Sequence, residues 1–184
     1  MIIETPRLEL RPLAENDAEA IWPFVSDPAI SRFMSWHPHA NLEQTRAFIA
    51  DVLLRMKAES TVAWVVVERA SGEICGLVSL LAIMRAHRAL RYDKAELAYW
   101  VGAPFQGRGY ATEACFAVLQ YAYQAIGLNK ITVAHDREND ASRALIVRLG
   151  FREVGTEYKH FCKDGRWIDH VIYELLSTDF RMPQ

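Results

Sequence analysis

The chain has 184 residues, a net charge of −2 and an apolar content of 51%. This length fits one domain with a sizeable core, and the near-neutral charge argues against a basic nucleic-acid-binding surface. No apolar run approaches the ~20 residues that a membrane span needs. We therefore expect a single domain over residues 1–184 that binds neither nucleic acid nor membrane.

The cysteines and histidines predict neither disulfides nor a metal site. Cys75, Cys115 and Cys162 are odd in number and lack CxxC spacing, which favours a reduced, cytoplasmic protein with Cys75 and Cys115 as core thiols. The chain begins directly with a strand-like segment, so no signal peptide is expected. His37 and His39 have no third ligand at a sensible spacing, and zinc is not implied.

The amino-terminal part predicts a strand followed by two helices. Residues 5–12 alternate apolar and charged side chains, which is typical of an antiparallel strand. Asn16 with Glu19 has the spacing of a capping box at a helix start. Asp27-Pro28 opens a second, short helix, and residues 34–39 are expected to form a loop.

A third helix and a hairpin come next. Asn41 and Gln44 again have capping-box spacing. Residues 62–67 and 74–80 are apolar runs joined by a short polar segment, which predicts a hairpin. Residues 85–94 are polar, cationic and without periodicity, so a loop is expected there.

Residues 95–127 predict a strand, a glycine turn and an amphipathic helix. Residues 95–101 mix apolar and aromatic side chains in the manner of a packed strand. Gly107 and Gly109 interrupt it, and from Tyr110 onward apolar residues recur at steps of three and four. Because the first N–H groups of a helix are unpaired and its dipole favours anions, this turn is a candidate phosphate site.

The spacing in this turn excludes two common nucleotide motifs. No Lys-Ser/Thr pair follows Gly109, as a P-loop would require, and the third glycine of a dinucleotide fingerprint would fall at Thr112. The pattern that remains is Gln106-x-x-Gly109-x-Ala111. A turn that merely joins strand to helix is the alternative interpretation.

The carboxy-terminal part predicts a strand at 130–135, a helix at 141–149, a strand from Gly150, and a hairpin through residues 163–165 into a last strand at 167–175. There are no internal repeats. Together the elements indicate an α+β domain with a mostly antiparallel sheet flanked by helices.

Gln106-x-x-Gly109-x-Ala111 resembles the pyrophosphate motif of the GNAT family of acetyl-CoA-dependent N-acetyltransferases. Residues 4–13, 95–101, 107–114 and 139–142, the last followed by Leu149-Gly150-Phe151, resemble segments of its RimJ/RimL-type members in the same order. The resemblance implies a three-layer GNAT fold in which the parallel strands 95–101 and 130–135 splay apart around a pantetheine arm. It also implies acetyl-CoA as cosubstrate, an amine acceptor and no metal, and it leaves a homodimer open.

The resemblance further assigns cofactor-binding residues. Backbone N–H groups from Gly107 to Ala111 would hold the diphosphate, Asn139 the pantetheine amides, and a backbone N–H near Val101 would polarise the thioester carbonyl. Arg108 would offset phosphate charge, with an exposed loop cation as the alternative. The full predicted set is Trp100, Val101, Gln106, Gly107, Arg108, Gly109, Tyr110, Ala111, Thr112, Asn139 and Ser142.

Two catalytic residues are predicted, each beside an alternative. A substrate amine must lose a proton, and Glu96 on the central strand is the first candidate base, with His160 or a water relay as the others. Ser142 matches a serine proposed in RimL-like enzymes to donate to the coenzyme A sulfur, although it could equally cap a helix. Many GNAT proteins place a tyrosine where this chain has Ile146, which favours Ser142.

The acceptor is the least determined part of the prediction. Trp36 and Tyr99 are predicted to line the acceptor side, and Tyr158 and Trp167 are further candidates that could instead belong to the core. The acceptor could be a protein N-terminus or a small amine. A noncatalytic acyl-CoA-binding module and a transferase of longer acyl chains are the alternative functions.

Overall fold

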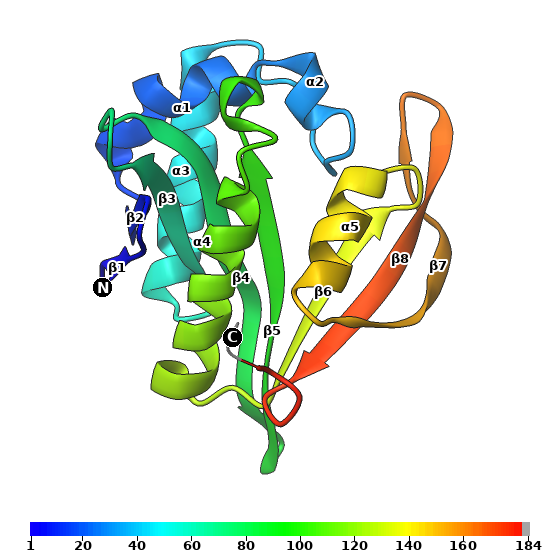
Figure 1. Ribbon diagram of the computed structural model, residues 1–184. Helices are drawn as coiled ribbons and strands as arrows, with labels where there is room; N and C mark the ends of the chain where they lie inside the picture. Colours follow the sequence, from blue (N-terminus) through cyan, green and yellow to red (C-terminus); the bar gives the residue numbers. More distant parts are fainter. Residues whose placement is uncertain (182–184) are drawn as a thin grey trace.

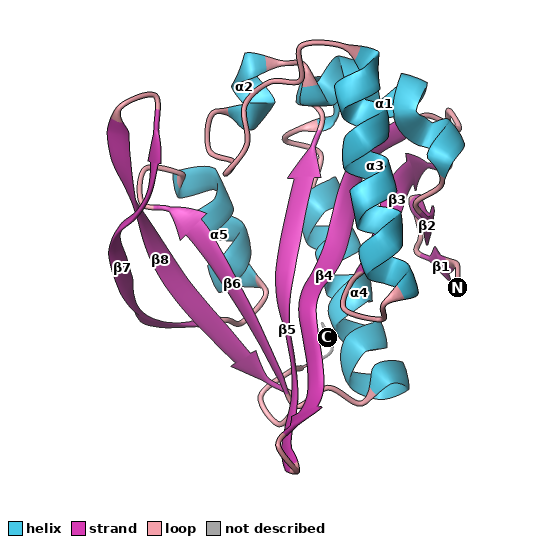
Figure 2. Cartoon of the chain, turned by 180° about the vertical axis from the view of Figure 1, so that it is seen from behind, coloured by secondary structure: helices cyan, strands magenta, loops and turns pink. Residues whose placement is uncertain are grey.

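The computed structural model describes residues 1–181 and contains one eight-stranded sheet between layers of helices (Figure 1, Figure 2). The spatial order of the strands is β1-β2-β3-β4-β5-β6-β8-β7. Every neighbouring pair is antiparallel except β5 and β6. The predicted fold class, a mixed and mostly antiparallel sheet with one parallel pair, is confirmed. The strands are β1 (Ile3–Glu4), β2 (Leu8–Pro12), β3 (Val62–Glu68), β4 (Ile74–His87), β5 (Leu90–Val101), β6 (Lys130–Asp136), β7 (Arg152–Lys163) and β8 (Arg166–Leu176).

Helices cover both faces of the sheet, but unevenly. In Figure 1, α4 lies over β4 and β5, and α5 lies over β6; from behind, α1 and α3 cover β3 and β4, while β6, β7 and β8 carry no helix (Figure 2). The helices are η1 (Glu15–Asp17), α1 (Ala18–Val25), α2 (Pro28–Ser31), α3 (Leu42–Lys57), η2 (Ala103–Phe105), α4 (Tyr110–Tyr121), the π-helical η3 (Ala122–Ile126) and α5 (Asp140–Arg148).

The second half of strand β5 contributes side chains to two cores, one on each face of the sheet. Ala95 and Leu97 pack into the core under α4, whereas Trp100 packs into the core under α1 and α3. Successive side chains of a strand point to opposite faces. The alternation of apolar and aromatic residues that predicted this strand therefore reflects two cores that receive alternate residues.

Strands β5 and β6 run side by side over a short length only. Their parallel register joins Lys94 to Lys130, Ala95 to Ile131 and Glu96 to Thr132, and it ends there. Beyond it, β5 stays paired with β4 as far as Val101, and β6 stays paired with β8 as far as Asp136. The two strands separate toward these ends (Figure 2), as the predicted splayed pair requires.

The loop predicted at residues 85–94 is wrong, because β4 and β5 continue through it as a hairpin. His87 pairs with Leu90 across a two-residue turn, in which Arg88 and Ala89 have φ of 48° and 65°. Positive φ at both central residues is typical of tight hairpin turns that usually contain glycine or asparagine. Arg85 forms an ion pair of 3.1 Å with the buried Asp93, which gives this cationic segment an internal partner.

The capping box predicted at Asn16 and Glu19 is also wrong. Asn16 lies within η1, and the carboxylate of the next residue, Asp17, accepts a hydrogen bond from the Ala14 N–H at 2.9 Å. Arg11 pairs with Asp17 at 2.6 Å. The Asp17 carboxylate, and not the Asn16 side-chain amide, therefore makes the side-chain hydrogen bond at this helix start.

The predicted helix starts at Asp27-Pro28 and at Asn41 are confirmed. Asp27 Oδ1 accepts from the Ala29 N–H at 2.8 Å, and Asn41 Oδ1 accepts from the Gln44 N–H at 2.9 Å. The Gln44 side chain accepts from the Ala40 N–H at 2.8 Å, one residue earlier than the predicted capping box has it. These caps fix the starts of α2 and α3.

Candidate functional site

The glycine turn before α4 leaves open space at the start of a helix. Gly107 and Gly109 have φ of 74° and 79°, a backbone conformation that glycine adopts without steric cost. A Cβ atom added to Gly107 would meet no heavy atom within 4 Å. Because α4 begins at Tyr110, its first N–H groups and its dipole face this space, and the residues present fit a phosphate group.

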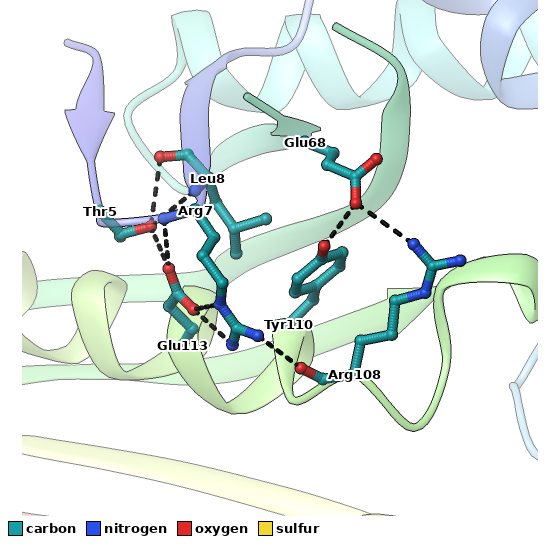
Figure 3. Close-up of polar contacts among 7 residues, drawn as sticks. All are labelled: Thr5, Arg7, Leu8, Glu68, Arg108, Tyr110 and Glu113. Atoms are coloured by element: carbon teal, nitrogen blue, oxygen red, sulfur yellow. Dashed lines mark hydrogen bonds and ion pairs between the residues drawn. The ribbon is translucent and has the colours of Figure 1, made fainter. Parts of the chain in front are cut away.

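Side chains from the amino-terminal segment hold this turn in place (Figure 3). Glu113, in the first turn of α4, accepts from Thr5 Oγ1 at 2.6 Å and from Arg7 Nε at 2.7 Å. Arg7 Nη1 in turn donates to the Arg108 carbonyl at 2.8 Å. Partial burial opposes the charge of Glu113, but the bonds from Thr5 and Arg7 outweigh it and lower the pKa of this carboxyl.

Arg108 itself points away from the glycine turn (Figure 3). Its guanidinium lies 3.3 Å from Glu68, which also accepts a hydrogen bond from the Tyr110 hydroxyl. Hydrogen bonds from Tyr110 and Ser71 and the charge of Arg108 lower the pKa of Glu68. The predicted pairing of the Arg108 side chain with a phosphate would therefore compete with this ion pair.

A cavity of about 470 Å³ joins the glycine turn to the space between β5 and α5. It brings together most of the predicted cofactor-binding residues, namely Trp100, Val101, Gln106, Gly107, Gly109, Tyr110, Ala111, Thr112, Asn139 and Ser142, together with Tyr99. A second hollow of about 830 Å³ lies between α4 and residues 1–7. Gly109, Thr112 and Arg148 line both, so the two spaces adjoin.

Ser142 lies in this cavity and is not the cap of its helix. The side chain of Asn139 caps α5 by accepting from the Ser142 N–H at 3.1 Å. The Ser142 hydroxyl is 2.8 Å from the Tyr99 hydroxyl. Burial raises the pKa of Tyr99, so the phenol keeps its proton.

Glu96 lies near charged groups of β7. His160 Nδ1 lies 2.6 Å from Glu157 Oε2, and the His160 ring stacks on His170 at 4.6 Å. Although Glu96 is open to solvent, partial desolvation raises the pKa of its carboxyl; His160 lowers this pKa and Glu157 raises it. The candidate base Glu96 is therefore influenced electrostatically by His160, the other side chain considered as a base.

The predicted acceptor-side aromatics lie mostly elsewhere. The Trp36 ring packs on His39 at 5.6 Å and against the core under α1 and α3. Tyr158 and Trp167 are 70% and 56% exposed, so neither belongs to the core. Both lie on the hairpin of β7 and β8, which no helix covers in Figure 2. Tyr99 does line the cavity.

Sequence reasoning missed part of the cavity wall. Phe33 and Met34 line it and come from the segment that follows α2. Met34 lies within the predicted loop 34–39 and Phe33 directly precedes it, so their nearness to Trp36, predicted for the acceptor side, is the signal that could have found them. Arg148, at the end of α5, has no sequence signal beyond its charge.

The described residues 1–181 contain no cluster of three or more His, Cys, Asp or Glu side chains suited to a metal ion. Within the same residues, no helix is both long enough and apolar enough to cross a membrane.

The sheet with its splayed strands and the glycine cradle at α4 define the class of fold and site that acetyltransferases of the GNAT type share. A family model described as an acetyltransferase (GNAT) domain matches residues 7–152. The chain belongs to this family, and the resemblance seen in its sequence is confirmed.

Known relatives agree with this assignment. The chain is 26% identical over 176 residues to the uncharacterized N-acetyltransferase YoaA of Bacillus subtilis, which covers 96% of this chain and 97% of that protein. It is 29% identical to the [ribosomal protein uS5]-alanine N-acetyltransferase of Escherichia coli over 59% of this chain and 54% of that one. A solved structure of RimL, a ribosomal L7/L12 alpha-N-protein acetyltransferase, in complex with coenzyme A, has a TM-score of 0.86 at 22% identity and covers 96% and 98% of the two chains.

The contacts of Glu113 that hold the glycine turn predict an effect on the free energy of unfolding. Glu113→Gln removes the charge that pairs with Arg7 but keeps the shape of the side chain, and it should cost about 1–2 kcal/mol of unfolding free energy. For a chain of this size that is a fall in Tm of about 2–8 °C, measured by calorimetry at neutral pH. Because the pKa of Glu113 is lowered, this contribution should disappear as the pH falls below the usual carboxyl range.

The control for that experiment is Glu43→Gln. Glu43 forms a 2.7 Å ion pair with Arg46, but its side chain is 77% exposed. Exposed pairs of this kind contribute little. An equal fall in Tm for both variants would contradict the anchoring role of Glu113.

Proposed function

We propose that this chain transfers an acetyl group from acetyl-CoA directly to a primary amine, without a metal. The observation that carries the proposal is the Ser142–Tyr99 hydroxyl pair, which shares one cavity with the glycine cradle. A phosphate site and a proton donor at a fixed separation suit a long cosubstrate whose diphosphate and sulfur lie far apart. Membership of the GNAT family supports the same reaction.

A series of polar groups would bind the cosubstrate along its length. The N–H groups from Gly107 to Ala111 and the Thr112 hydroxyl would bind the diphosphate. The Asn139 side-chain N–H₂ group, which the capping bond leaves unused, and the polar groups along the inner edges of β5 and β6 would bind the pantetheine amides. The Val101 N–H is the proposed donor to the thioester oxygen.

The transfer step requires two proton movements. The amine nitrogen bonds to the thioester carbonyl carbon, the carbon–sulfur bond breaks, and the departing thiolate takes up a proton. Ser142 would donate toward that sulfur while its oxygen accepts from the Tyr99 O–H, and such chains of hydrogen bonds strengthen one another. The neutral phenol of Tyr99 keeps the serine in this orientation.

The second proton leaves the amine, and Glu96 is the proposed base. Its raised pKa makes its carboxylate a better proton acceptor than an ordinary glutamate. A water relay would serve the same role, and His160 is the competing base because it lies on β7 among the groups that affect Glu96.

The proposal is tested by acetyl-CoA consumption, read as free thiol release. The acceptor panel holds peptides with varied first residues, polyamines, amino acids and aminoglycosides. Release with one acceptor class supports the N-acetyltransferase and identifies its substrate. Coenzyme A binding by calorimetry without release from any acceptor would instead favour a noncatalytic binding module; a panel of longer acyl-CoA thioesters tests the remaining alternative.

The glycine cradle predicts the first mutational effect. Gly109→Trp should abolish coenzyme A binding measured by calorimetry, because the indole would occupy the space proposed for the diphosphate. The new Cβ atom would also lie 3.4 Å from Arg7 Nη2. Gly72→Trp is a matched control, since Gly72 has φ of 75° in an open turn between β3 and β4. Both variants carry the same backbone strain. Unchanged affinity in Gly109→Trp would disprove the assignment of the diphosphate.

The hydroxyl pair predicts a second effect. Ser142→Ala should lower kcat about 100-fold while the Kd of coenzyme A changes little, because the donor acts on the developing thiolate. Tyr99→Phe should lower kcat by less, about tenfold, since it removes the partner and not the donor. If Ser142→Ala turns over at the wild-type rate, the serine has only a structural role.

The proposed base predicts a pH dependence. The carboxylate form of Glu96 is active and its pKa is raised, so kcat/KM should fall as the pH decreases through a value above the usual glutamate range. Glu96→Gln should remove this acidic limb of the pH profile, that is, the fall in kcat/KM at low pH. It should also lower kcat/KM about 100-fold. A limb that persists in Glu96→Gln but is lost in His160→Gln would assign the base to His160 instead.

A further inference from the structure

Lys163 is the last residue of β7, and its ammonium group donates hydrogen bonds to three backbone carbonyl groups. Its Nζ lies 2.5 Å from the Ser31 carbonyl oxygen, 3.0 Å from that of Met34 and 2.9 Å from that of Trp36. A lysine ammonium has three N–H donors, and here each has a carbonyl acceptor. Neither the predicted motifs nor the proposed reaction gives this residue a role.

The three carbonyls belong to one segment, residues 31–37, which we call the roof segment. It begins with the last residue of α2 and lies more than 120 residues before Lys163 in the chain. A second link joins the same two parts of the structure, since His37 Nδ1 lies 3.7 Å from Asp164 Oδ1. Both of these side chains are exposed, so this link is weak and Lys163 provides the main connection.

This connection spans the open end of the splayed strands. At one end, β5 and β6 are joined by the three register pairs from Lys94 to Glu96. At the other end, α2 and the roof segment extend from the part of the molecule that carries β5 toward the hairpin of β7 and β8 (Figure 1, Figure 2). Backbone pairing leaves this end of the slot open, and the hydrogen bonds of the Lys163 side chain close it.

The roof segment also forms part of the cavity wall. Phe33 and Met34 line the cavity that holds the Ser142–Tyr99 pair. Met34 also provides one of the carbonyl oxygens that accept a hydrogen bond from Lys163 Nζ. A change in the bonds to Lys163 would consequently move side chains beside the proposed reaction centre.

We propose that Lys163 is a positioning residue that latches the roof segment across the slot and so fixes the wall against which the amine acceptor binds. The cosubstrate end depends on it less, because the Arg7–Glu113 network holds the glycine turn separately. Lys163 shares β7 with Glu157 and His160, the groups that influence Glu96. The latch thus acts on the acceptor side. This inference rests on the proposed acetyl transfer for its kinetic part only.

The test compares Lys163→Met with Lys159→Met, its matched control. Methionine keeps the length of the side chain but has no N–H donors, and Lys159 is an exposed lysine on the same strand. Amide hydrogen exchange of residues 31–37 in the free protein should become at least about tenfold faster in Lys163→Met and stay unchanged in Lys159→Met. Because exchange needs no substrate, this result is readable even if acetyl transfer is not found.

The kinetic readout separates positioning from general destabilisation. With the acceptor identified by the panel, Lys163→Met should raise the KM for the amine about tenfold, with a smaller change in the KM for acetyl-CoA. Lys163→Arg, which keeps the charge but holds its donors in a planar fork, should show an intermediate exchange rate and KM. It also serves as the second variant if Lys163→Met does not fold.

Two results would overturn the proposal. Unchanged exchange in residues 31–37 of Lys163→Met would show that the ammonium does not hold the roof segment. Faster exchange with an unchanged KM for the amine, or an equal rise in both KM values, would show that the latch does not position the acceptor.

Discussion

The structure depends on the short parallel pairing of β5 with β6. Three register pairs join the strands, and after Glu96 and Thr132 each strand keeps only its outer partner. Backbone N–H and C=O groups on the inner edges are then left facing the slot, where burial without partners is costly. An extended ligand rich in amides satisfies such edges as a neighbouring strand would. The gap in the strand pairing is therefore also the proposed binding site.

The start of α5 shows how two polar residues divide two tasks. A helix start needs a capping acceptor, and a serine that served as the cap would have its oxygen occupied. Here Asn139 accepts from the Ser142 N–H, while the Ser142 hydroxyl bonds to Tyr99 on β5. Ile146, at the position where many GNAT proteins carry a tyrosine, is fully buried in the core. The phenol that contacts Ser142 in this chain is that of Tyr99 on β5.

Local patterns predicted the features that are local. The alternation in β5, the caps Asp27 and Asn41, and the glycine turn depend on residues close in sequence, and the structure has them. The hairpin through residues 85–94 was missed because Arg88 and Ala89 adopt positive φ without glycine. Long-range contacts gave no signal at all. The Tyr99–Ser142 pair spans 43 residues, and the bonds of Lys163 span 127 or more.

The two ends of the slot are closed by different means, and this difference has a mechanical consequence. The β5–β6 end is held by backbone hydrogen bonds within a sheet, which break only when strands separate. The roof end is held by one ammonium group and one exposed ion pair, which can open by side-chain rotation alone. If the slot widens during a catalytic cycle, it must do so at the roof end. That end adjoins Phe33 and Met34, which line the same cavity as the hydroxyl pair, so the movement would open the proposed acceptor side. The glycine turn proposed for the diphosphate is held separately by Arg7 and Glu113.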